Sequence, residues 1–311
     1  CGATLVWLMN ALASVVRGTG NMRVPSVTIL ITSALQIVVG GVLCLGLGPA
    51  PALGLQGIAI GNIVSSGVGA AFLLWYLMTG QGRLVLRLQG VQLQRGMFAD
   101  ILKVGALACL SPLQSVLTTL VFTGFIARLG TEALAGYGIG QRLEFMLIPI
   151  AFGIGVASVP MVGMAVGAGQ VPRARRVAWI AGGVSAVNLG VVGLIVSLMP
   201  QVWSSLFSKD AQVLASASQY LSLAGPAFPL FGFGLTLYFA SQGSGKVLGP
   251  VMAATLRLIL VIAVGSWLAN GTPEAWHYYA LVAGAMAVYG LATAAAIWFT
   301  PWGEKEKGVR S

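Results

Sequence analysis

The sequence predicts an all-α polytopic membrane protein made of two parallel-repeat six-helix bundles, the first of them incomplete. Three observations support this fold class. Of the 311 residues, 57% are hydrophobic and 8% are charged, whereas about 25% of the residues in soluble domains are charged. The apolar residues form runs long enough to cross a bilayer, which takes about 20 residues in a helix. A short glycine-containing junction occurs twice, near the two ends of the chain.

The two junctions occupy residues 17–25 and 242–250 and lie between long apolar runs. Three residues of the first recur in the second at one constant offset: Gly18 as Gly243, Gly20 as Gly245 and Pro25 as Pro250. We call the spacing from Gly18 to Gly243 the repeat offset. A shared spacing with the same flanking pattern indicates an internal repeat. Paired helical bundles in a membrane are typical of transporters.

The apolar runs predict a partial membrane span followed by eight full ones. The partial span is 1–16, and the full spans are 24–47, 54–78, 101–128, 133–165, 174–199, 212–241, 249–269 and 276–299. Prolines inside membrane helices bend the axis and free carbonyl groups that other helices or water must satisfy. Because several predicted spans contain proline, we expect bent helices around a cavity.

Basic residues are distributed unevenly between the two sides of the predicted membrane. One side carries Arg128 and Lys209, and the other carries thirteen Lys and Arg residues. By the positive-inside rule the second side is cytoplasmic, which predicts a multi-pass protein of a bacterial-type inner membrane with a cytoplasmic C-terminus. Because the positive charge lies between apolar spans, it indicates topology, and no nucleic acid partner is expected.

Both junctions fall on the predicted cytoplasmic side, so the repeat is expected to be parallel, about an axis along the membrane normal. A complete unit then has six helices, and this chain holds about 8.5 of twelve. The predicted parts are 1–78, the end of helix 4 with helices 5 and 6; 79–97, a cytoplasmic linker with an amphipathic pattern; 98–299, the second bundle of helices 7–12; and 300–311, a cytoplasmic tail.

Glu144 is the one acid predicted deep in the membrane, because the other six lie in loops, at span ends or in the tail. It follows Glu132 by twelve residues, or about 18 Å along a helix inside a hydrocarbon core of about 30 Å. At that depth an ionised carboxylate is costly, so Glu144 faces a wet cavity or holds a proton. Two interpretations stay open: proton coupling or substrate contact, and a structural salt bridge with Arg257.

Other polar and aromatic residues are further candidates for the transport site. Tyr137 and Gln141 share one helix face with Glu144, whereas Arg142 lies about 200° around the helix from it. The remaining candidates are Gln36 and Gln114 on polar stripes of their helices, and Phe145 and Tyr238, whose rings could stack on flat cations. The spacing of Cys, His and acidic residues predicts no metal site.

Several short motifs follow one another along the chain. They are Arg17-Gly18-x-Gly20-Asn21-x-Arg23-x-Pro25, Gly54-x-x-Gly57-x-Ala59, Pro149-x-x-x-Gly153-x-Gly155, Val162-Gly163, Gly167-Ala168-Gly169 and Arg173-Ala174. Together they resemble the multidrug and toxic compound extrusion (MATE) antiporters. The resemblance implies two bundles that rock about a central cavity. It also implies export of small organic, often cationic compounds in exchange for inward protons or sodium ions, with no cofactor besides the coupling cation. A monomer in the lipid bilayer is expected.

The coupling acids of the MATE family have no direct match in this sequence. The family places an Asn four residues before an Asp on the fifth helix, and the matching positions are Gln36 and Gly40. It also places acids on the first and fourth helices of the second bundle, but spans 101–128 and 212–241 contain none. The resemblance therefore leaves both H⁺ and Na⁺ open as the coupling ion.

There are two alternatives to an exporter, a flippase, which is also a transporter, and an intramembrane enzyme, which belongs to another functional class. A flippase for a lipid-linked sugar would need a larger cationic cavity, while Arg142 and Arg257 are the two basic residues predicted in the central spans. An intramembrane enzyme is disfavoured because the sequence lacks a His-Glu-x-x-His motif and a serine with a base partner.

Overall fold

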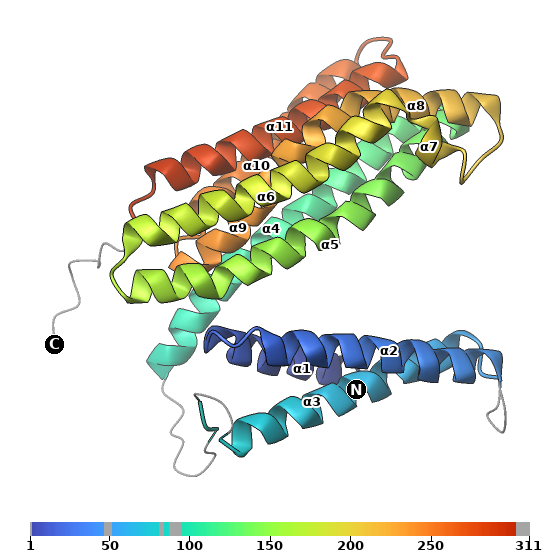
Figure 1. Cartoon of the computed structure of the whole chain (residues 1–311). Helices are drawn as coiled ribbons and strands as arrows, with labels where there is room; N and C mark the ends of the chain where they lie inside the picture. The colour runs from blue at the N-terminus through green and yellow to red at the C-terminus, as the bar shows by residue number, and fades with distance from the viewer. Residues whose placement is uncertain (1, 47–51, 81–83, 87–94, 303–311) are drawn as a thin grey trace. The chain divides into compact units, whose positions relative to one another are not determined.

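The computed structural model describes residues 2–46, 52–80, 84–86 and 95–302. Within these residues, eight helices are long and apolar enough to cross a membrane. The predicted all-α membrane fold is therefore confirmed. The chain divides into two compact units, Cys1–Gln94 and Arg95–Ser311, and each is considered by itself (Figure 1). Arg83 and Arg87 of the predicted linker, and residues 303–311 of the predicted tail, lie outside the described part of the chain.

The described residues of the first unit form three helices: α1 (Gly2–Gly18), α2 (Arg23–Leu45) and α3 (Leu55–Met78). Helix α3 packs on both of the others. Its contact with α2 is close because glycines meet there: a Cβ atom on Gly61 would lie 2.6 Å from the backbone of Gly40. Small residues allow such an approach where lipid supplies no hydrophobic force between helices.

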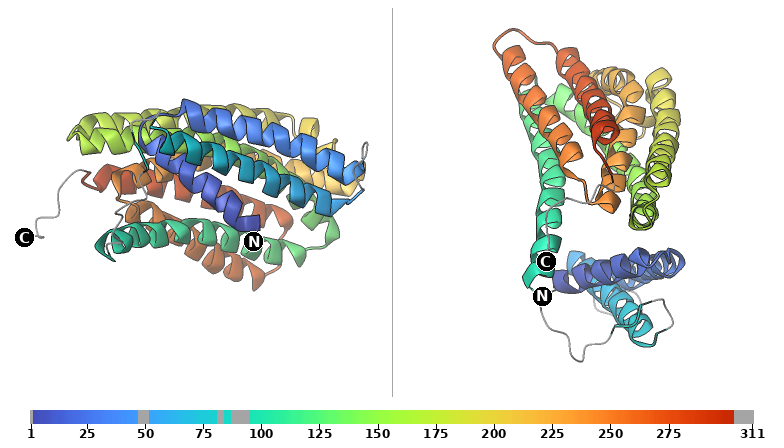
Figure 2. Two further views of the ribbon diagram at one scale, coloured as in Figure 1. Left: turned by 90° about the horizontal axis from the view of Figure 1, so that it is seen from below. Right: turned by 90° about the vertical axis from the view of Figure 1, so that its left-hand side faces the viewer.

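The second unit contains six membrane-length spans within residues 95–302, the part of it that the structure describes. Its helices are α4 (Arg95–Ala127), α5 (Thr131–Gly167), α6 (Val171–Leu198), α7 (Gln201–Ser204), α8 (Ala211–Ala224), α9 (Phe228–Ser244), α10 (Leu248–Ala269) and α11 (Ala275–Phe299). Helices α5, α6 and α9 pack on one another, and α10 packs on both α4 and α11 (Figures 1 and 2). The core contains the fully buried rings of Tyr220, Tyr278, Tyr279, Phe122 and Phe228.

Helices α8 and α9 are two parts of one span, joined by a 3₁₀ turn at Gly225–Ala227. Pro226 in this turn and Pro229 in the first turn of α9 remove backbone donors, which is the expected cause of a break in an α-helix. The turn packs tightly on α6, where Gly193 and Gly225 face each other without side chains between them. The single span predicted at 212–241 is therefore present in an interrupted form.

The start of α4 and the presence of α7 differ most from the prediction, because the prediction followed apolar residues alone. Helix α4 begins at Arg95, six residues before the predicted start at 101. Helical hydrogen bonding can continue past the end of an apolar run, so a span and its helix need not begin together. The short helix α7 was not predicted, since four residues carry no periodic signal.

The repeat predicted from the junctions is visible in the helix boundaries. Helix α2 begins at Arg23 and α10 at Leu248, and these two positions are separated by the repeat offset. Gly20 and Gly245 both adopt positive φ, +84° and +71°, a conformation that favours glycine. The two junctions therefore fold in the same local way.

Candidate transport cavity

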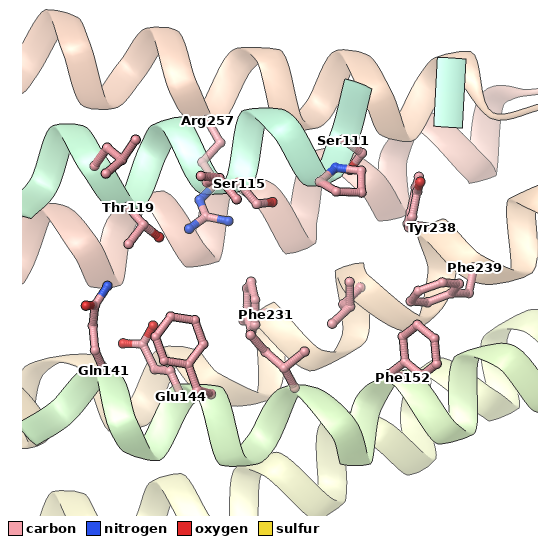
Figure 3. A pocket seen from close by; sticks show the side chains of 16 residues that line it. Ser111, Ser115, Thr119, Gln141, Glu144, Phe152, Phe231, Tyr238, Phe239 and Arg257 are labelled. Atoms are coloured by element: carbon pink, nitrogen blue, oxygen red, sulfur yellow. The ribbon is translucent and has the colours of Figure 1, made fainter. Parts of the chain in front are cut away.

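A cavity of about 430 Å³ lies within the second unit, between α4, α5, α9 and α10. Its volume is within the range of pockets that hold drug-sized ligands. Its walls are mainly apolar and aromatic, with a few polar side chains (Figure 3). The polar lining residues are Ser111, Ser115 and Thr119 of α4, Gln141 and Glu144 of α5, Tyr238 of α9 and Arg257 of α10.

Glu144 lines the cavity from α5 and is half-buried. Its Oε1 accepts a hydrogen bond from the hydroxyl of Tyr220, which lies on α8. The Tyr220 ring is fully buried and makes edge-on contacts with Tyr137 and Tyr279, with both ring centroids at 5.3 Å. Gly140 makes this arrangement possible, because a Cβ atom at that position would overlap the Tyr220 ring. The carboxylate is thus held by a donor that packing fixes in place.

The polar face predicted on α5 is present, but its members have different surroundings. Gln141 lines the cavity and donates from Nε2 to the Tyr137 hydroxyl at 3.0 Å. Tyr137 is buried behind the cavity wall. Gln141 and Glu144 therefore face the cavity while Tyr137 orients Gln141 from behind.

Arg257 lines the opposite wall and is 8% exposed. Its guanidinium carbon lies 5.5 Å from the centroid of the Phe231 ring and 5.7 Å from that of Tyr289, so two aromatic rings flank the charge. Its Nε has no hydrogen-bond partner. Arg257 and Glu144 share the cavity, yet within the described part of the chain no ion pair joins them at 4.0 Å or less. The structural salt bridge considered from the sequence is not formed in this structure.

Three other candidates lie on or near this cavity. Phe145 lines it and is 57% exposed. Tyr238 also lines it and donates from its hydroxyl to the carbonyl of Ala108 at 2.7 Å, which ties α9 to α4. Gln114 does not line the cavity; its Nε2 donates to Thr255 Oγ1 at 2.7 Å and so joins α4 to α10.

The last two candidates lie elsewhere. Arg142 is exposed, with its guanidinium carbon 5.0 Å from the centroid of the Phe207 ring, beside a separate pocket. Gln36 is a half-buried residue of α2, in the first unit. Neither residue lines the cavity that contains Glu144.

Sequence reasoning missed Tyr220 and two hydroxyl residues of the cavity, Ser115 and Thr119. A buried tyrosine hydroxyl needs a polar partner, so Tyr220 in an apolar span was a usable signal. Ser111, Ser115 and Thr119 follow the i, i+4, i+8 spacing of one helix face. Gln114, the residue of α4 that the sequence suggested, does not lie on that face.

Known membrane proteins match most of this chain in sequence. The MatE family model matches residues 108–267. The chain is 26% identical over 272 residues to an FAD transporter of Shewanella oneidensis, covering 86% of this chain and 60% of that protein. It is 27% identical over 288 residues to a probable multidrug resistance protein, NorM, of Thermotoga maritima, covering 86% of this chain and 59% of that protein. The chain thus spans about 60% of the length of these relatives.

Solved structures of transporters have the same fold as this chain. The bent form of the MATE transporter VcmN of Vibrio cholerae superimposes with a TM-score of 0.83 at 20% identity. The match covers 96% of this chain and 66% of that chain. A MOP superfamily transporter of Pyrococcus furiosus gives a TM-score of 0.83 at 19% identity, with 96% and 66% of the two chains covered.

Proposed function

The chain belongs to the MatE family, and we propose that it forms part of a secondary antiporter. The whole protein exports organic, often cationic or amphipathic compounds in exchange for inward protons or sodium ions, by alternating access. Family members are transporters and not enzymes. The relatives named as a multidrug resistance protein and as an FAD transporter support an organic substrate.

The observation that carries the proposal is the carboxylate of Glu144 in a cavity with aromatic walls. A carboxyl group in such surroundings is unfavourable as a lone ion, so it gains a proton or a cationic partner. A proton and the cationic group of a substrate then compete for the same oxygen atoms. Competition for one site is sufficient for exchange, because arrival of one cation releases the other.

The charge asymmetry of the loops supports the orientation that we propose, with the C-terminus in the cytoplasm of a bacterial-type plasma membrane. We propose that the protein acts as a monomer and uses the coupling cation alone, with no cofactor. The competing proposal, a flippase for a lipid-linked sugar, fits less well. Arg257 is the one basic residue among the described residues that line the cavity, and a pyrophosphate-linked lipid calls for more positive charge.

The test is efflux of the cationic dye ethidium from vesicles that contain the full-length protein, with proton and sodium gradients imposed separately. We expect a proton gradient to drive export and Glu144→Gln to abolish it while the protein stays folded. Glu132→Gln is the matched control, because it removes an exposed carboxylate at the start of α5. Unchanged proton-driven export by Glu144→Gln would remove Glu144 from the coupling mechanism, and export driven by sodium alone would assign the other ion.

A further inference from the structure

Arg257 is a buried cation that the cavity does not neutralise. It is 8% exposed, and its Nε has no hydrogen-bond partner. The flanking rings of Phe231 and Tyr289 stabilise the charge through their π faces, but they accept no conventional hydrogen bond from the guanidinium. Buried arginines normally find carboxylates or carbonyl oxygens. The missing partner is therefore an acceptor that the described part of the protein does not supply.

Glu144 would be the natural partner, but it is engaged elsewhere. It accepts from the Tyr220 hydroxyl on α8, and no ion pair with Arg257 is present. Figure 3 shows the two residues on different walls, with Glu144 beside Gln141 and Arg257 extending from the side of Ser115 and Thr119. The cavity therefore keeps its acid and its base apart.

We propose that Arg257 binds the anionic group, a carboxylate or a phosphate, of a flat aromatic compound held in this cavity. The proposal rests on the proposed function, because it takes the cavity to be the transport site. A guanidinium is planar and donates two parallel hydrogen bonds, which match the geometry of a carboxylate or a phosphate. An anionic group at Arg257 leaves the Glu144 carboxylate to the proton and to a cationic group of the same compound, which still compete there.

The rest of the cavity fits the aromatic part of such a compound. Phe231 and Phe239 of α9 and Phe152 of α5 line it, and their rings can stack on a flat molecule. The hydroxyls of Ser115 and Thr119 line the same wall as Arg257 and can add donors to an anionic oxygen. The volume of about 430 Å³ accommodates a drug-sized ring system.

The experiment measures direct binding of two dyes with similar three-ring frames to the purified full-length protein in detergent, by fluorescence polarisation. Fluorescein is used at a pH where it is a dianion, and rhodamine 6G carries a positive charge. We expect Arg257→Met to weaken fluorescein binding about tenfold or more, the effect of losing one charge-assisted pair. Rhodamine 6G should bind Arg257→Met at least as tightly, and this binding also reports that the variant is folded.

Two further variants complete the test. Arg257→Lys keeps the charge but loses the planar pair of donors, so fluorescein binding should fall between wild type and Arg257→Met. Arg128→Gln makes the same charge change at an exposed position outside the cavity and should leave both dyes unaffected. Fluorescein binding that is absent, or equal in wild type and Arg257→Met, would overturn the proposal.

The outcome is separable from that of the proposed function. Export of ethidium without Arg257-dependent binding of fluorescein would retain the antiporter and reject the anion site. Arg257-dependent fluorescein binding without any gradient-driven export would retain the anion site and reject the antiporter. Competition identifies the source of the anion: displacement of fluorescein by the soluble aromatic acid 1-naphthoate supports the proposal, whereas displacement by phosphatidylglycerol alone would assign the arginine to a lipid headgroup and overturn it.

Discussion

The junction between α1 and α2 and the junction between α9 and α10 have the same backbone geometry. In each, a hydroxyl near the end of the first helix donates to a carbonyl three residues earlier: Thr19 to Val16 at 2.7 Å, and Ser244 to Ser241 at 2.8 Å. The glycine that follows each hydroxyl has positive φ, and the next helix begins at matching positions. All of these features are related by the repeat offset. The internal repeat thus extends to individual hydrogen bonds.

The buried chemistry beyond the junctions differs between the two copies. At the repeat offset, Thr32 of α2 corresponds to Arg257 of α10. Thr32 is 6% exposed and donates to the carbonyl of Thr28 in its own helix at 2.9 Å. Arg257 is equally buried but lies between the rings of Phe231 and Tyr289. The two copies therefore share the backbone of the junction, while only the second has a charged residue at this buried position.

Thr32→Arg tests this difference most severely and has the largest expected effect. Thr32 packs directly on Gly69, where a Cβ atom would lie 2.7 Å from the threonine Cγ2. An arginine at this position would be buried without a carboxylate or flanking rings, and a buried uncompensated charge costs about 3–5 kcal/mol. We expect loss of the folded protein, measured as monodisperse yield and thermal unfolding in detergent.

Thr32→Val is the control for Thr32→Arg. It keeps the volume and removes a hydroxyl that bonds only within its own helix, so the unfolding temperature should change little. If Thr32→Arg folded as well as wild type, position 32 of α2 would tolerate a buried charge as well as position 257 of α10 does. The difference that we infer between these two positions would then be wrong.

The glycines Gly40 and Gly265 also correspond at the repeat offset, but different groups pack against them. Adding a methyl group at each of these two contacts should have an intermediate effect on stability. Gly40 lies against the backbone of Gly61 in α3, so the Cβ of Gly61→Ala would force two backbones apart. The Cβ of Gly265→Ala would meet the Phe125 ring, and a side chain can shift more readily than a backbone. Overpacking typically costs about 1–3 kcal/mol. We expect about 2–3 kcal/mol for Gly61→Ala and about 1 kcal/mol for Gly265→Ala, measured as free energies of unfolding. Equal losses would contradict the difference in packing.

The hydrogen bond between Tyr220 and Glu144 joins two helices of the second unit, whereas buried Thr32 of the first unit bonds within its own helix, and a double-mutant cycle measures the bond between helices. Tyr220→Phe and Glu144→Leu should be coupled by about 1–2 kcal/mol, because the first removes the donor of the bond and the second removes the acceptor. Tyr279→Phe serves as the control: its hydroxyl donates to the carbonyl of Ala133, so its effect should add to that of Glu144→Leu. Additive effects of Tyr220→Phe and Glu144→Leu would show that the bond contributes nothing to stability.

The membrane spans could be predicted from sequence because lipid leaves the backbone few options. A chain in hydrocarbon must satisfy its own backbone hydrogen bonds, so each long apolar run becomes a helix. The prediction of 249–269 for α10, observed at Leu248–Ala269, depended on that constraint alone. The 3₁₀ turn between α8 and α9 follows from Pro226 and Pro229, and both prolines can be read from the sequence.

The cavity was harder to predict because its residues come from helices that are distant in sequence. Glu144 was identifiable by its depth, but its partner Tyr220 is 76 residues away and approaches only because Gly140 leaves room. On α4, the choice between Gln114 and Ser115 is a rotation of about 100°. That rotation is fixed by the contact of Gln114 with Thr255 in α10, which no pattern within α4 reveals.

The smallest expected effect concerns Asn21 and Lys246, which occupy the same position in the two junctions. Asn21 Oδ1 accepts hydrogen bonds from the backbone nitrogens of Arg23 at 3.1 Å and Val24 at 3.3 Å, which satisfies donors at the start of α2. A lysine has no acceptor and cannot do the same for α10. We expect Asn21→Ala to cost about 1 kcal/mol, as for other residues that cap helices, and Lys246→Ala to change stability by less than about 0.5 kcal/mol. Lys246→Asn is the sharper test. Because the two junction backbones match, the new amide should find the same donors and raise the unfolding temperature, and a decrease would mean that the match ends before the first turn of α10.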